Sequence, residues 1–82
     1  MKTDAVKQIA SDYSLDALKI VEQQLLNGEI PSTPIPGEDE GEKLTHVLSA
    51  IWVLETMETE KITLVQALRK MAGRVRNSIQ PD

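Results

Sequence analysis

The chain has 82 residues, a formal net charge of −4 and no cysteine. A chain of this length forms a single domain, and without cysteine it has neither a disulfide framework nor a thiolate metal site. Trp52 and Tyr13 are its only aromatic residues, too few for the aromatic platform on which single-stranded nucleic acids stack. We therefore expect one domain with an aliphatic core over residues 1–82.

The charges are distributed unevenly along this domain. Residues 22–60 carry nine acidic residues and one basic residue, whereas residues 61–82 carry five basic residues and one acidic residue. No apolar run approaches the roughly 20 residues of a membrane helix, and residues 1–5 lack the apolar stretch of a secretory leader. These observations predict a soluble protein of the cytoplasm that has no contact with a membrane.

Residues 1–28 are expected to form an N-terminal helical hairpin. Ser14 is suited to cap the start of the second helix, and Asn27-Gly28 is suited to end it. The two helices are separate because the apolar stripe changes register at Ser14. The first stripe consists of Val6, Ile9, Ala10 and Tyr13, and the second consists of Leu15, Leu18, Val21 and Leu25.

Residues 29–41 form a long connector that is rich in proline and acidic residues. Its prolines, Pro31, Pro34 and Pro36, exclude a regular helix. Ile30 and Ile35 are candidates to anchor the connector to the core. Two possibilities stay open, because a connector of this length is either ordered on its own chain or allows the hairpin to exchange between chains.

The third predicted helix starts near residues 38–42 and carries the strongest signal. Between Val47 and Leu54 only Ser49 is polar. Together with the apolar residues on either side, this run makes a band roughly 260° wide, where a surface helix needs a stripe of about 100–140°. Other helices or a second chain must cover the excess. We predict a homodimer with a two-fold contact through Leu48, Ile51, Trp52 and Val53.

A polar hinge at residues 58–62 precedes the fourth predicted helix. Thr63 and Gln66 have the spacing of a capping box, in which each side chain bonds the other residue's backbone N–H group. Residues 42–80 are therefore expected to form a C-terminal hairpin. The predicted fold is all-α, with four helices in two hairpins and a bundle completed by dimerisation. The apolar stripe of the last helix consists of Leu64, Leu68, Met71, Ala72, Val75 and Ile79.

Candidate residues for chemistry are few. Glu42 and His46 lie one turn apart and could provide two ligands to a metal, but such a site needs three or four. We expect His46 to lie beside the apolar band and Glu55 and Glu58 to lie near it, at a frayed end or paired with a basic residue. No nucleophile accompanies these groups, so we expect a protein that is not an enzyme and binds no cofactor.

The basic residues of the last helix suggest a nucleic-acid-binding regulator as an alternative. They are spread around the helix, and the whole chain is acidic, so this alternative ranks below a non-enzymatic interaction or accessory protein, with a second copy or an unknown protein as its partner. A metal-dependent site around Glu42 and His46 is a second alternative. The basic residues concerned are Arg69, Lys70, Arg74 and Arg76.

One pattern of mostly apolar residues in the second half of the chain consists of Ala50-Ile51, Val53, Met57, Ala67-Leu68, Arg74-Val75 and Ser78-Ile79. In this pattern residues 41–79 resemble a family of small, uncharacterised bacterial helical proteins that are known only as domains of unknown function. The resemblance implies a helical fold and no established activity.

Overall fold

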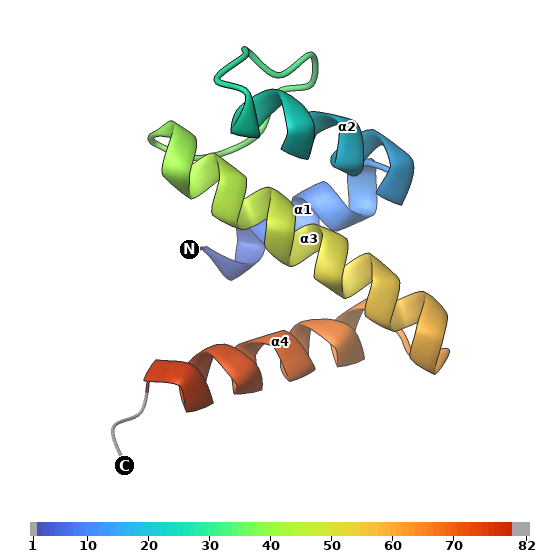
Figure 1. Ribbon diagram of the computed structural model, residues 1–82. Helices are drawn as coiled ribbons and strands as arrows, with labels where there is room; N and C mark the ends of the chain where they lie inside the picture. The colour runs from blue at the N-terminus through green and yellow to red at the C-terminus, as the bar shows by residue number, and fades with distance from the viewer. Residues whose placement is uncertain (1, 80–82) are drawn as a thin grey trace.

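The structure, a computed structural model, describes the backbone of residues 2–79 and the side chains of residues 2–74. This part of the chain contains no strand, and the predicted all-α class with four helices is confirmed. The helices are α1 (Thr3–Asp12), α2 (Leu15–Leu26), α3 (Glu40–Glu60) and α4 (Leu64–Ile79), as Figure 1 shows.

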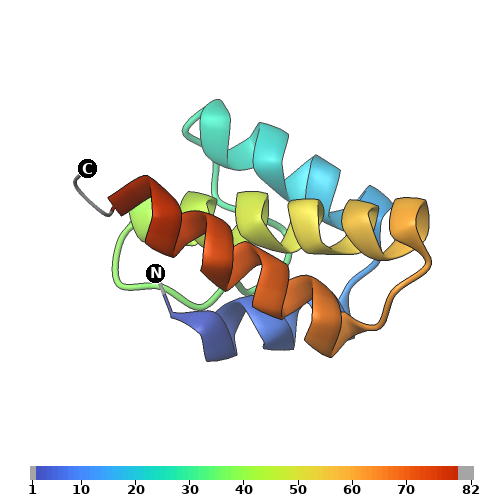
Figure 2. The same ribbon diagram turned by 90° about the horizontal axis from the view of Figure 1, so that it is seen from below.

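α3 is the central helix of the structure. It packs against α2 on one side and α4 on the other, and α1 lies behind it in Figure 1. Figure 2 shows that α4 runs antiparallel to α3, and α4 packs against both α3 and α1. α1 and α2 make their main contacts with α3 and not with each other, so the predicted N-terminal hairpin is not confirmed.

The ends of the helices follow from local capping chemistry. The Ser14 hydroxyl accepts the N–H of Ala17 at 3.2 Å, and Asp39 accepts the N–H of Glu42 at 2.8 Å. Thr63 and Gln66 bond each other's backbone N–H groups at 3.0 and 3.2 Å, which confirms the predicted capping box. These bonds satisfy N–H groups that have no partner within the first turn of a helix.

α3 extends further than the sequence predicts, because residues 58–60 are helical and the hinge begins only at Lys61. Lys61 adopts the left-handed conformation with φ 58° and ψ 44°, and its N–H bonds the carbonyl of Met57. Ile62 donates to the same carbonyl at 3.3 Å. The left-handed residue therefore stops α3 abruptly, and the hinge is shorter than expected.

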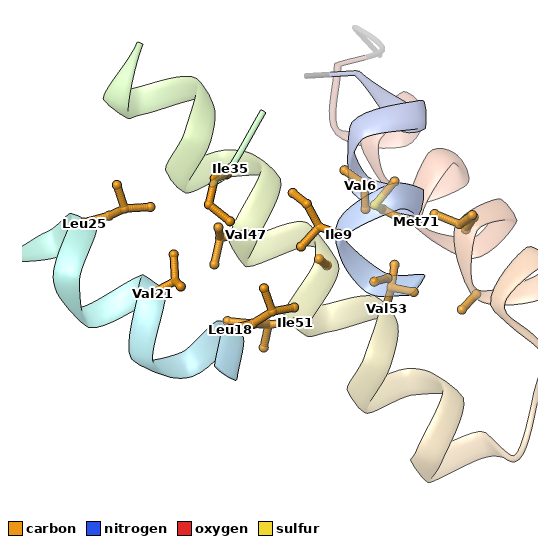
Figure 3. Packing of buried hydrophobic residues seen from close by; sticks show 14 residues of the cluster. Val6, Ile9, Leu18, Val21, Leu25, Ile35, Val47, Ile51, Val53 and Met71 are labelled. Atoms are coloured by element: carbon orange, nitrogen blue, oxygen red, sulfur yellow. The ribbon is translucent and has the colours of Figure 1, made fainter. Parts of the chain in front are cut away.

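The hydrophobic core fills the space around α3, as Figure 3 shows. Val47, Ala50 and Val53 on α3 are completely buried. The other helices and the connector contribute the remaining buried residues: Val6, Ile9 and Ala10 of α1, Leu18, Val21 and Leu25 of α2, Ile35, and Ala67, Leu68 and Met71 of α4, together with Ile51 of α3.

The connector is held on its own chain. Ile35 is part of the core, whereas Ile30 is 91% exposed, so only one of the two predicted anchors reaches the core. The Tyr13 hydroxyl donates to the carbonyl of Pro34 at 3.4 Å, and the N–H of Ser32 donates to Gln24 at 3.0 Å. These contacts tie the connector to α1 and α2.

Truncation of Leu18 and of Ile20 should separate the core from the surface of α2. Leu18 is completely buried and Ile20 is exposed. We expect Leu18→Ala to lower the free energy of unfolding by about 2–5 kcal/mol through lost burial and an internal cavity. Ile20→Ala should change it by less than about 0.5 kcal/mol. Urea unfolding followed by circular dichroism measures both, and equal effects would contradict this position of the core.

Replacement of Lys61 should stabilise the end of α3. Left-handed backbone costs a residue with a Cβ atom about 1–2 kcal/mol, and glycine avoids this cost, although it also gains freedom in the unfolded chain. We expect Lys61→Gly to raise the free energy of unfolding by about 0.5–1 kcal/mol. Lys61→Ala is the matched control, because it removes the same charge but keeps the Cβ atom. A gain of the same size in the control would rule out this explanation.

Candidate interaction surface

The structure separates the four residues predicted to form an interface. Ile51 and Val53 are 8% and 0% exposed and belong to the core of a single chain. They face α1, α2 and α4, so in this structure they cannot contribute to an outer surface, and this part of the prediction is corrected. Leu48 is 45% exposed and Trp52 is half-buried. The other helices of the chain therefore cover most of the wide apolar band of α3.

The accessible side chains of α3 include one row, which we call the α3 row: Leu48, Trp52, Glu55 and Thr59. The spacing of four, three and four residues places them along one side of the helix. His46, which contacts the start of α1, lies about 160° around the helix from Leu48. The α3 row therefore faces away from α1.

α2 borders the α3 row on one side. The ammonium of Lys19 lies 3.9 Å from the carboxylate of Glu55, and Figures 1 and 2 show that α2 and α3 run antiparallel. Seven residues make about two turns of either helix, so the register that brings Lys19 to Glu55 also brings Leu26 opposite Leu48. Leu26 is 58% exposed. Both exposed leucines therefore lie on the side of the α2–α3 pair that carries Lys19 and Glu55.

α4 borders the α3 row on the other side. The guanidinium of Arg74 lies 4.9 Å from the centre of the Trp52 ring, within the range of a cation–π interaction. One turn earlier on α4, Lys70 forms an ion pair with Glu60 at the end of α3. Leu26, Leu48 and Trp52 thus form a small apolar area with charged neighbours on both sides. We call it the leucine–tryptophan patch.

His46 has a structural role that the sequence did not indicate. The ring is almost completely buried, and the N–H of Lys2 donates to Nε2 at 3.0 Å. Nδ1 lies 2.7 Å from the carbonyl oxygen of Pro36, which can only accept, so Nδ1 carries the proton. His46 therefore joins the start of α1, the connector and α3, and does not lie at the flank of the apolar band as predicted. Lys2 is 44 residues away in the sequence, so helical spacing gave no sign of this contact.

The structure does not assemble a metal site around Glu42 and His46. Both ring nitrogens of His46 are engaged with backbone groups. Glu42 accepts the N–H of Glu38 at 3.1 Å, an interaction that closes the start of α3. Among the described residues, no group of three or more histidine, aspartate and glutamate residues is arranged to hold a metal ion. The metal-dependent alternative therefore gains no support from the geometry.

The two carboxylates expected near the apolar band both lie at the surface. Glu55 is exposed and pairs with Lys19, one of the two situations that the sequence predicts for it. Glu58 is exposed. Neither carboxylate is a buried group that could act as a general acid or base.

The basic residues of α4 do not share one face. Lys70 and Arg74 point toward α3, where they contact Glu60 and Trp52. Arg69 is exposed and lies at least 100° around the helix from either of them. Arg76 lies outside the described side chains. Phosphate contacts along a nucleic acid need several cations on one side, so this arrangement gives no support to the nucleic-acid alternative.

The fold and this surface define a small all-α protein that is built around one central helix. The chain belongs to a family of unknown function, DUF6952, whose model matches residues 1–80. This confirms the expected relation to an uncharacterised family, and it extends the match from residues 41–79 to the N-terminal helices. Searches among curated proteins and among solved structures found no match.

Within the described residues, none of the helices combines the length and the apolar character that crossing a membrane requires.

Replacement of His46 should test its role in joining three segments. We expect His46→Leu to lower the free energy of unfolding by about 2–4 kcal/mol, because the N–H of Lys2 and the carbonyl of Pro36 lose their partner. Thr45→Leu, at the exposed neighbouring position, should change it by less than about 0.5 kcal/mol. Urea unfolding measures the stability, and hydrogen exchange at the Lys2 amide shows whether the start of α1 opens. Unchanged exchange in His46→Leu would contradict the role described here.

Proposed function

We propose that this chain is a non-enzymatic interaction protein of the cytoplasm that associates with a second copy of itself through the α3 row. The observation that carries the proposal is the leucine–tryptophan patch. Leu26 and Leu48 are 58% and 45% exposed and border a half-buried tryptophan, whereas Val47, Ile51 and Val53 of α3 are buried. Tryptophan and arginine side chains are enriched at the centres of protein interfaces.

The chemistry of the described residues supports interaction over catalysis. His46 is the only histidine, and both of its nitrogens hold backbone groups of the same chain. Glu55 and Glu58 of α3 lie at the surface, and the chain has no cysteine. A catalytic site needs several polar groups that converge on one accessible position. The described residues bring no such group together.

The charges around the leucine–tryptophan patch support a second copy as the partner. Glu55 and Lys70 have partners in their own chain, Lys19 and Glu60, which leaves Glu22 on α2 as an acidic group and Arg74 on α4 as a basic group. A two-fold contact places the same surface on both sides of the interface, so such a surface must complement itself. One that has apolar residues in the middle and opposite charges at its two edges meets this requirement.

Leu48→Asp should weaken the association strongly. It places a carboxylate in the middle of the leucine–tryptophan patch, where association would remove water from it. We expect a dimer whose dissociation constant rises about 100-fold in the variant, which corresponds to roughly 3 kcal/mol. The measurement is the native mass by light scattering over a dilution series.

Val65→Asp is the matched control for this change. Val65 is similarly exposed, but it lies on the side of α4 opposite to Arg74. The control should associate like the original chain. A monomeric mass at every concentration of the original chain would overturn the proposed self-association, and equal effects of the two variants would overturn its location.

A further inference from the structure

We infer that Glu22 and Arg74 fix the orientation of the two copies, with Glu22 of each copy facing Arg74 of the other. This inference rests on the self-association proposed above and names the residues that decide its geometry. It follows from the positions of the side chains along the axes of α2, α3 and α4.

Helical register places Glu22 of α2 and Arg74 of α4 on either side of Trp52. Arg74 contacts the ring of Trp52 directly, at 4.9 Å from the ring centre. On the other side, the Lys19–Glu55 pair sets the register of α2 against α3. Three residues, close to one turn, separate Lys19 from Glu22 and also Glu55 from Trp52, so Glu22 lies opposite Trp52. The surface thus presents an acidic, an aromatic and a basic side chain in sequence.

Neither Glu22 nor Arg74 forms an ion pair within the described part of the chain. The ion pairs found there join Lys19 to Glu55 and Lys70 to Glu60. Glu22 is half-buried and takes part in neither pair, and Arg74 is exposed with its guanidinium over an aromatic ring. An acidic and a basic group are therefore available on opposite edges of the surface.

A two-fold axis in the plane of the contact can run along α3 or across it. An axis across α3 would bring α2 against α2 and α4 against α4 of the second copy, so that Glu22 would face Glu22 and Arg74 would face Arg74. An axis along α3 brings α2 against α4 of the second copy, so that Glu22 meets Arg74 twice. Like charges at an interface are costly and opposite charges fix the register, which selects the axis along α3.

The axis along α3 also brings the α3 rows of the two copies together. Leu48 and Trp52 then lie near the same residues of the second copy, in the apolar centre of the contact. Glu55 also lies close to the axis, but each Glu55 has Lys19 of its own chain beside it, which reduces the repulsion between the two carboxylates.

Charge reversal at the two positions provides a test in trans. In Glu22→Arg alone, arginine faces Arg74 of the second copy, and in Arg74→Glu alone, glutamate faces Glu22. Each variant alone should associate at least about tenfold more weakly than the original chain.

In an equimolar mixture of the two variants, one of the two contacts again joins Glu22 to Arg74, and the other joins the two introduced residues, which also have opposite charges. The mixture should form a heterodimer with a dissociation constant within about threefold of the original, as measured by light scattering at low salt.

Two controls make the result specific. Asp4→Arg introduces the same change of charge on α1, which lies behind α3, and should leave the association unchanged. If Arg74→Glu does not fold, Glu22→Arg alone still decides the matter, because its weakening at low salt should shrink in 1 M salt as repulsion is screened.

The outcomes separate this inference from the proposed function. If the original chain associates and Leu48→Asp prevents association, but the mixture recovers no affinity, the proposed function stands and the orientation is wrong. If Glu22→Arg has no effect at low salt, the orientation is wrong as well. If the original chain is monomeric throughout, both proposals fail together. Recovery in the mixture supports the orientation, because only contacts between different chains can produce it.

Discussion

The structure depends on the burial of α3 by three other helices. α1 and α2 have only 10 and 12 residues, and helices of this length are marginal in water when they are isolated. Their stability comes from the apolar face that each lays on α3, whose own buried residues include Val47, Ala50 and Val53. Because α1 and α2 contact each other little, neither forms a core without α3. The chain therefore has one folding unit with α3 as its shared partner.

His46 extends this dependence to the connector and to the start of the chain. A buried imidazole needs a partner for each nitrogen, and here both partners are backbone groups from other segments. The same ring therefore satisfies the N–H that precedes α1 and a carbonyl of the proline-rich connector, which cannot form regular backbone pairing. The polar contact and the hydrophobic contact of Ile35 act on the same segment, so a connector without secondary structure has a defined path.

Local chemistry was predictable from the sequence, and the partners of side chains were not. Ser14, Thr63 and Gln66 cap helices a few residues away, so their roles follow from spacing alone. The width of the apolar band on α3 correctly indicated that something covers it. Periodicity does not say what covers it, and Ile51 and Val53 turned out to face helices of the same chain, while Leu48 does not. The role of His46 depends on Lys2 and Pro36, which only the folded chain brings to the ring.

Trp52 has a consequence for how this protein can be observed. It is the only tryptophan in the chain, so the near-ultraviolet emission of the protein comes almost entirely from one indole. That indole lies at the border between α3 and α4, with a guanidinium over its face. Separation of α4 from α3, or exclusion of water from this border by another molecule, changes the surroundings of this single fluorophore. The fluorescence of Trp52 therefore reports both on the packing of α4 against α3 and on the binding of another molecule at this border.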